Sequence, residues 1–373
     1  MVSLKATVVR PETLPTGLYR APPVDIGIGC LRLKPAHGDY PGLRRMCGGR
    51  PSEGVPVTVD GGVTGQTPGG DGVVAHEVWR RFGAVEALRG VNFTAAYGEV
   101  TGMVGPNGAG KTTLFLVLAT LLAHDSGQVW VGGFDPAHHA GAVRDQMGWV
   151  PDAFGFYDNL TAREYLTFAG AAYGLGRAAK DRAEELIGVA RLKEFSDQPV
   201  HVLSRGQKQR LGFVRALVHS PRVLLLDEPA AGLDPYSRVE LRALVRQLAS
   251  DGAAVVVSSH VLSDLEQMAD RVVFFDRGVT VGERRIADAV RVSGPRVWRV
   301  WALNAADLVA ALARHGYVHT PPTALGVDVE LDSDVAAAGL IAGLVHDGVQ
   351  VVSCAPLTST LEATYLQLTG EQA

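Results

Sequence analysis

The feature that most constrains the fold of this 373-residue chain is a glycine-rich loop, Gly105-Pro106-Asn107-Gly108-Ala109-Gly110-Lys111-Thr112. The loop matches the pattern G-x-x-x-x-G-K-[ST] and follows a short apolar run, residues 100–104. Its glycines let successive backbone N–H groups turn toward a phosphate, and a helix beginning there directs its positive end to the same place. The pattern therefore predicts a strand, a phosphate-binding loop and a helix in direct succession, as in an α/β fold.

A second apolar run, residues 223–226, ends in two acidic residues, Asp227 and Glu228. The carboxyl ends of parallel strands form the ligand-binding edge of a sheet, so both acids are expected beside the phosphate loop. There Lys111 would reach the β- and γ-phosphates, while Thr112 and a water held by Asp227 would ligate Mg²⁺. Glu228 would polarise the attacking water. The two patterns predict a P-loop nucleoside triphosphatase and leave its class open.

Residues 72–292 alternate apolar strands with helical stretches, which indicates an α/β core. A Thr-x-x-Glu capping box, Thr161 to Glu164, opens a helix that runs to about Tyr173. The turn Asp276-Arg277-Gly278 predicts a hairpin. Residues 293–373 predict a small α+β appendage, with strands at 296–302, 326–331 and 350–352 and helices at 307–315, 334–346 and 359–368.

Residues 1–71 differ from the rest because they are rich in glycine and proline and lack sustained periodicity. Such a composition does not bury enough apolar surface to offset the entropy of ordering, so a flexible tail is expected. Its basic residues also fit an anionic membrane surface, and a translation start further downstream is a third reading.

Composition and charge limit the other function classes. A net charge of −4 gives no reason to expect nucleic acid as a partner. Three widely spaced cysteines, Cys30, Cys47 and Cys354, suggest neither a disulfide framework nor a zinc site. No apolar run reaches the roughly 18 residues of a membrane span, and the N-terminus does not resemble a signal peptide.

The class is indicated by Leu203-Ser204-Arg205-Gly206-Gln207, which lies between the two phosphate-site patterns and opens a helix expected over residues 207–218. Here residues 72–290 resemble the nucleotide-binding cassettes of ABC transporters, whose signature is L-S-G-G-Q. Arg205 departs from the glycine pair, and Gly206 is expected to keep the tight turn. Ala231-Gly232-Leu233-Asp234 resembles the D-loop of this family, and His260 its switch histidine.

The resemblance implies an α/β cassette with a mixed sheet and a helical subdomain over about 153–220. It also implies ATP contacts from Phe82, Gly105, Pro106, Asn107, Gly108, Ala109, Gly110, Lys111, Thr112, Thr113, Ser204, Gly206, Gln207 and Asp234. Phe82 would stack on adenine, and Glu228, His260 and Lys111 would act in catalysis. In place of the family's Q-loop glutamine stands Asp152, whose carboxylate is expected to join Thr112 and Asp227 around Mg²⁺.

The resemblance also implies partners. The signature of one cassette faces the phosphate loop of a second, so a homodimer or heterodimer is expected, together with a separate integral-membrane permease. Residues 154–174 and 357–366 are similar to type-2 ABC exporters, which implies an export motor on the inner face of the cell membrane. The alternatives are a non-transport ABC ATPase acting on ribosomes or chromosomes, or a regulatory nucleotide-binding subunit.

Overall fold

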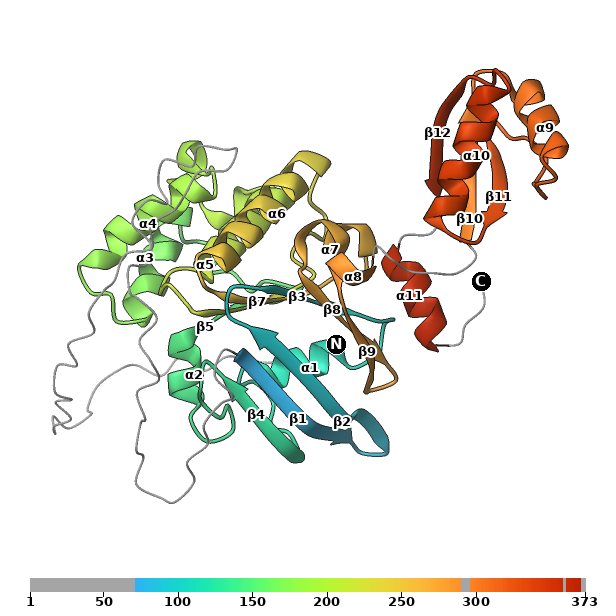
Figure 1. The fold of residues 1–373 in the computed structure, drawn as a ribbon. Helices are drawn as coiled ribbons and strands as arrows, with labels where there is room; N and C mark the ends of the chain where they lie inside the picture. Colours follow the sequence, from blue (N-terminus) through green and yellow to red (C-terminus); the bar gives the residue numbers. More distant parts are fainter. Residues whose placement is uncertain (1–70, 290–295, 358–359, 370–373) are drawn as a thin grey trace, which may run out of the picture.

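The computed structural model describes residues 71–289, 296–357 and 360–369 (Figure 1). The tail expected over residues 1–71 therefore lies, apart from Asp71, outside the described residues. Within the described part of the chain, no helix has the length and apolar character needed to cross a membrane.

The phosphate loop belongs to a six-stranded sheet with the strand order β5-β6-β7-β3-β8-β9. All neighbours pair in parallel except β8 and β9, which form the expected hairpin. The central strands are buried on both faces, which explains their unbroken apolar runs. The strands are β3 (Val100–Val104), β5 (Met147–Val150), β6 (Val223–Asp227), β7 (Ala254–Ser258), β8 (Arg271–Asp276) and β9 (Val279–Arg285).

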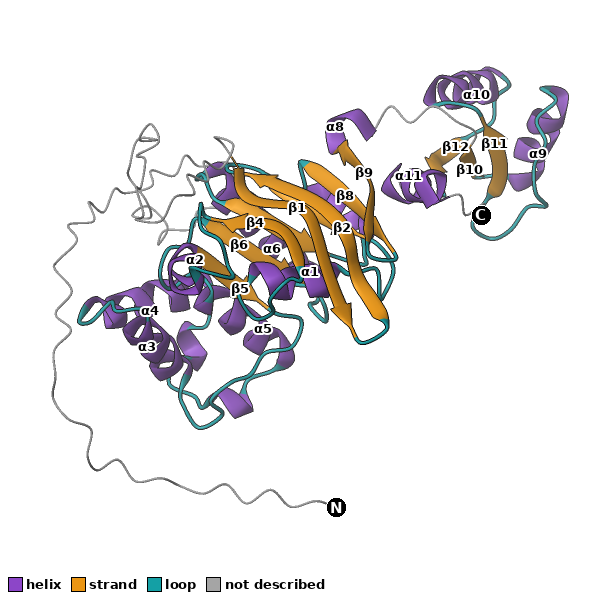
Figure 2. Ribbon diagram, turned by 90° about the horizontal axis from the view of Figure 1, so that it is seen from below, coloured by secondary structure: helices purple, strands orange, loops and turns teal. Residues whose placement is uncertain are grey.

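A second, antiparallel sheet covers one face of the first (Figure 2). Its order is β2-β1-β4, and its strands are β1 (Asp71–Phe82), β2 (Val85–Ala96) and β4 (Ser126–Val131). Helix α1 (Lys111–Leu118) contributes Leu114, Phe115 and Leu118 to the apolar core shared by the two sheets. The helix that follows the phosphate loop is thus anchored from both sides.

Helices build a second core on the opposite face of the six-stranded sheet. The helices of the cassette after α1 are α2 (Ala140–Gln146), α3 (Ala162–Ala172), α4 (Ala178–Val189), α5 (Arg205–Arg215), α6 (Pro235–Ser250), α7 (Leu262–Met268) and α8 (Ile286–Ala289). Two short 3-10 turns, η1 (Lys193–Phe195) and η2 (Val200–Val202), lead into α5. The expected start of the signature helix at residue 207 was wrong, because Ser204 and Gln207 form a capping box that begins α5 at Arg205.

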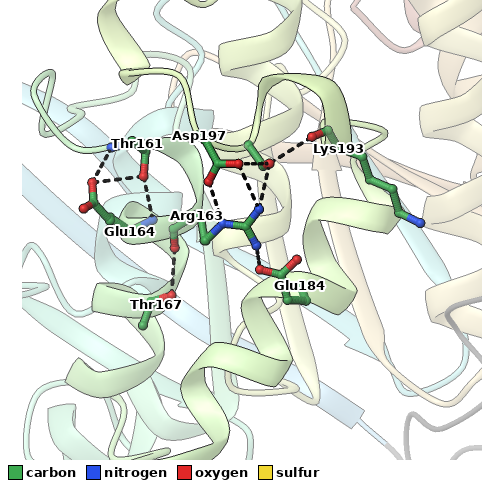
Figure 3. A network of polar contacts seen from close by, with 8 residues as sticks. Thr161, Arg163, Glu164, Thr167, Glu184, Lys193 and Asp197 are labelled. Carbon is green, nitrogen blue, oxygen red and sulfur yellow. Dashed lines mark hydrogen bonds and ion pairs between the residues drawn. The ribbon is translucent and has the colours of Figure 1, made fainter.

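Polar contacts fix the start of α3 against the segment that leads to the signature (Figure 3). The predicted capping box is present, since the Glu164 N–H donates to Thr161 Oγ1 at 3.2 Å and Glu164 Oε2 accepts from the Thr161 N–H at 2.9 Å. From the same turn, Arg163 Nε donates to Asp197 at 2.8 Å and the guanidinium also pairs with Glu184 on α4. The helical subdomain is therefore braced internally.

The C-terminal residues form a small sheet with the order β11-β10-β12 and its own apolar core. Its elements are β10 (Arg296–Ala302), α9 (Ala305–Arg314), β11 (Val327–Leu331), α10 (Asp334–His346) and β12 (Val351–Pro356). The last helix, α11 (Thr360–Thr369), was expected in this appendage but packs against α7, α8 and β9 of the cassette (Figure 1). Leu361 is fully buried there and belongs to the cassette core.

Candidate nucleotide site

An open pocket of about 960 Å³ lies between the phosphate loop and the turn that joins β1 to β2. The predicted residues that line it are Phe82, residues 107–113, Asp152, Asp227 and Glu228. They come from four separate segments of the chain and meet at the carboxyl ends of parallel strands. The topology therefore gathers the phosphate loop and the acids that the sequence predicted for one site.

Two glycines of the loop are required by its geometry. A side chain at Gly105 would lie only 2.3 Å from the carbonyl oxygen of Phe275, so the loop packs directly on the end of β8. Gly110 has φ 101° and precedes the first residue of α1, a conformation that other residues adopt at a cost. These positions hold the loop's backbone around the mouth of the pocket.

Lys111 folds back over the loop that precedes it. Its ammonium donates to the carbonyl oxygens of Gly105 at 2.6 Å and Pro106 at 3.0 Å, and the residue is only 9% exposed. Burial lowers the pKa of Lys111, and the nearby carboxylates of Glu228 and Asp227 oppose that shift. An ammonium held in this way can transfer its hydrogen bonds to phosphate oxygens without a new conformation of the main chain.

Asp227 and Glu228 are positioned by a serine that the sequence did not single out. Ser258, opposite Asp227 at the end of β7, donates through Oγ to Asp227 Oδ1 at 2.6 Å. Ser258 Oγ also accepts from the Glu228 N–H at 3.0 Å. One buried hydroxyl therefore fixes the side chain of the first acid and the backbone of the second.

The environment of Asp227 suits a cation. Burial raises the pKa of Asp227, the Ser258 hydrogen bond opposes this, and the Asp152 carboxylate raises it further. The Thr112 hydroxyl and the Lys111 ammonium act in the opposite direction. Two carboxylates and a hydroxyl thus face the same space, and this all-oxygen set is the kind that Mg²⁺ prefers.

Glu228 and His260 are in direct contact at the edge of the pocket. Nδ1 of His260 lies 2.7 Å from Glu228 Oε2, and the ionised carboxylate can only accept, so Nδ1 carries the proton of this bond. Glu228 has φ 49°, a left-handed conformation that is costly for a residue with a side chain and is concentrated at functional sites. The pair leaves the second carboxylate oxygen, Oε1, available to a water.

Phe82 is presented with one ring face covered. The Arg80 guanidinium carbon lies 4.9 Å from the ring centroid, and Arg80 is itself paired with Asp125 at 2.8 Å. The phenylalanine is 47% exposed and lines the pocket. An aromatic ring fixed in this way offers its other face to a planar base.

The remaining predicted residues lie away from the pocket of their own chain. Ser204 and Gln207 cap α5, with Gln207 Oε1 accepting from the Ser204 N–H at 2.7 Å, and Gly206 follows within the first turn. Asp234 caps α6, where its carboxylate accepts from the Ser237 N–H at 2.9 Å and from the Ser237 hydroxyl at 2.6 Å. These hydrogen bonds lower the pKa of Asp234.

The comparisons with known proteins agree with this geometry. The family model described as "ABC transporter" matches residues 88–231. The linearmycin resistance ATP-binding protein of Bacillus subtilis is 32% identical over 303 residues, which cover 79% of this chain and 97% of that protein. A daunorubicin resistance ATP-binding protein of Streptomyces coeruleorubidus is 34% identical over 301 residues, or 78% and 94% of the two chains.

Solved structures show the same fold. The ATP-binding subunit of an ABC transporter superposes with a TM-score of 0.55 at 28% identity, covering 58% of this chain and 91% of that one. A dimeric ATP-binding cassette in a post-hydrolysis state, bound to ADP and Pi, superposes with a TM-score of 0.53 at 26% identity, covering 57% and 98%. The phosphate loop, the neighbouring acids Asp227 and Glu228 and these relatives together show that the chain belongs to the ATP-binding, ATP-hydrolysing subunits of the ABC transporter family.

Proposed function

We propose that the pocket binds Mg-ATP and that hydrolysis there powers export through a separate membrane permease. The observation that carries the proposal is the convergence of the phosphate loop, Asp227 and the Glu228–His260 pair on one pocket. Thr112, Asp152 and Asp227 would hold the Mg²⁺. When bound, this ion offsets phosphate charge and fixes the geometry of the triphosphate.

Lys111, Glu228 and His260 would each have a different role in hydrolysis. Lys111 would exchange its two carbonyl partners for β- and γ-phosphate oxygens. Glu228 would accept the proton of the attacking water through Oε1, because Oε2 is already bound by His260. Because Nδ1–H of His260 is bound to Glu228, only the imidazolium form has a second N–H, at Nε2, and this group would stabilise the negative charge that develops at this edge of the site.

We infer that the complete site needs two cassettes. Ser204, Gly206 and Gln207 form the start of α5, where Ser204 is exposed and the capping box leaves the N–H groups of the first two helical residues free for an anion. A second copy, or a related cassette, would present this start to the γ-phosphate and bring Asp234 to the shared interface. The dimeric relative bound to ADP and Pi supports this arrangement.

We infer that the permease contacts the aromatic face of the helical subdomain. Phe156, Tyr165, Tyr157 and Phe168 form a continuous chain of ring contacts, with centroid distances of 5.3–6.5 Å. Tyr157 and Phe168 are 59% and 50% exposed. An exposed aromatic pair of this kind fits an interface, and the motor would accordingly lie at the inner face of the cell membrane.

The cargo proposed for the transporter follows from the relatives. Two of them are named for resistance to linearmycin and daunorubicin. We propose that this motor drives export of a drug-like compound or another cargo handled by type-2 exporters. Residues 72–292 and α11 would form the motor, and residues 296–356 an accessory domain.

The ATPase activity can be tested on the purified full-length chain. Wild-type protein should hydrolyse ATP in the presence of Mg²⁺ and stop when the ion is chelated. Glu228→Gln should bind ATP and accumulate as a dimer with little turnover, and Lys111→Ala should lose nucleotide binding. A Glu228→Gln variant that turns over at the wild-type rate would remove Glu228 from the role of base.

The permease can be identified by pull-down from detergent-solubilised membranes. Recovery of a multi-span membrane protein, lost when Tyr157 and Phe168 are both replaced by serine, would support the proposed interface. Recovery of ribosomes in place of a membrane protein would overturn the transport function.

A further inference from the structure

The turn between β8 and β9 forms part of the wall of the nucleotide pocket. It consists of Arg277 and Gly278, and Arg277 lines the pocket. The Gly278 N–H donates to the Ala109 carbonyl at 3.1 Å, and the Gly278 carbonyl accepts from the Arg89 N–H at 2.8 Å. The turn is therefore fastened to the phosphate loop on one side and to β2 on the other.

The backbone of this turn favours a residue other than arginine. Arg277 has φ 45° and Gly278 has φ 82°, the combination of a two-residue type I′ hairpin turn. Asparagine or glycine is preferred at the first position, because other residues adopt the left-handed conformation at a cost. Such costly conformations cluster at active sites and ligand-binding sites.

The Arg277 side chain is available to a ligand. It is 83% exposed, and its ion pair with Asp276 is long at 3.8 Å. By contrast, Arg81, which also lines the pocket, is paired with Glu86 at 2.7 Å. Arg277 thus combines a fixed backbone with a weakly engaged guanidinium.

The charges of the pocket are unevenly placed. Asp152, Asp227 and Glu228 lie at the metal end, so that a triphosphate entering the pocket needs cations elsewhere. Lys111 serves the terminal phosphates. Arg277 lines the same pocket as Phe82, on a turn whose backbone bonds to Ala109 of the phosphate loop and to Arg89 of β2, the strand that follows the Phe82 turn.

We propose that Arg277 binds the phosphate chain of the nucleotide near the ribose. The inference rests on the proposed function, since it places a further nucleotide contact in the same pocket. The sugar-proximal phosphates are common to ATP and ADP and do not change in hydrolysis. The contact therefore contributes equally to ground-state and transition-state binding, so it lowers KM and leaves kcat unaltered.

Two substitutions and a matched control test the contact on the full-length protein. Arg277→Ala and Arg277→Asn should each raise KM for ATP, and Kd for ADP by titration calorimetry, about five- to tenfold, with kcat unchanged. Because the lost contact is exposed to solvent, the difference from wild type should shrink as salt concentration rises. Arg284→Ala removes an exposed arginine of the same hairpin that does not line the pocket, and should change neither constant.

Arg277→Asn separates binding from folding. Asparagine suits the turn better than arginine, so this variant should melt about 2 °C higher than wild type while binding nucleotide more weakly. A higher melting temperature with unaltered KM and Kd would overturn the proposal and leave the turn a structural element. A fall in kcat would overturn it as well. In both cases wild-type ATP hydrolysis would stand, whereas an inactive wild type would refute the proposed function itself.

Discussion

His219 joins the helical subdomain to the edge of the catalytic sheet, and its environment predicts acid sensitivity. The imidazole stacks on Tyr173 at the end of α3, with ring centroids 3.8 Å apart. Nε2 lies 3.1 Å from the Met147 carbonyl oxygen at the start of β5, and must donate because a carbonyl only accepts. Nδ1 is buried and has no hydrogen-bond partner among the described residues. A proton on Nδ1 would therefore be buried without an acceptor.

The cost of that proton can be worked out from the pKa. Burial lowers the pKa of His219 from 6.5 to about 4, against the opposing effect of the Met147 carbonyl. Between pH 6.5 and pH 4 the unfolded chain binds a proton that the folded chain excludes, so the free energy of unfolding falls as the pH falls. At about 1.36 kcal/mol for each pH unit, the loss reaches about 3 kcal/mol at pH 4.

Urea denaturation from pH 4 to pH 8 measures this loss, if wild type is compared with His219→Gln. The glutamine keeps a donor for the Met147 carbonyl and does not titrate. Burial raises the pKa of Asp251 to about 6, so that this partly exposed acid removes stability in the opposite direction, as the pH rises from 3.8 to 6. Both proteins contain Asp251, so its contribution cancels when the unfolding free energy of one is subtracted from that of the other.

The variant should therefore show a flatter pH profile than wild type, by up to about 3 kcal/mol at pH 4. His346→Gln, an exposed histidine on α10, is the matched control and should keep the wild-type slope. Parallel profiles for wild type and His219→Gln would refute the reasoning, as would a His219 imidazole that titrates near 6.5 by NMR.

Three further predictions follow from single contacts. Ser258→Ala removes the partner of Asp227 and of the Glu228 amide, so kcat should fall and unfolding should become easier by about 1–3 kcal/mol; an unchanged kcat in a stopped-time ATPase assay would contradict the positioning role. Asp152→Gln removes a negative charge beside Asp227, so half-maximal hydrolysis should require more Mg²⁺ while ATP binding in EDTA strengthens; an unmoved Mg²⁺ titration would argue against a ligand at residue 152. Leu361→Ala should lower the free energy of unfolding of the cassette by about 2–4 kcal/mol, although the residue lies near the C-terminus; denaturant titration of a variant as stable as wild type would show that α11 is not part of the core.

The sequence predicted the parts of the site that depend on local pattern. The loop at Gly105 lies between β3 and α1 as expected, and β6 ends in Asp227 at the carboxyl edge of the sheet. Glu228 and His260 were each assigned to catalysis, but their contact depends on two neighbouring strands ending at the same level. Only the register between β6 and β7 brings them within 2.7 Å.

The places of Ser258 and Arg277 at the site could not be predicted from the sequence. Serine after an apolar strand is common, and only the pairing of Asp227 with Ser258 reveals that its hydroxyl serves both acids. Arg277 was seen as part of a hairpin turn. Its approach to the pocket depends on two glycines: the missing side chain of Gly105 lets β8 touch the phosphate loop, and that of Gly278 lets the turn approach Ala87 on β2.

The packing of α11 against the cassette could not be predicted from the sequence either, and it changes the boundary between the two domains. Its helical stripe, Leu361, Tyr365 and Leu368, is visible in the sequence, but a stripe does not identify the surface that it covers. In the structure Leu361 is buried, its N–H donates to Glu266 on α7 at 2.9 Å, and Leu368 packs over Gly282 of β9. Helix α7 begins two residues after His260. The chain thus leaves the cassette after α8, forms the small domain and returns to the helix that follows His260, so the small domain is connected to the motor at both of its ends.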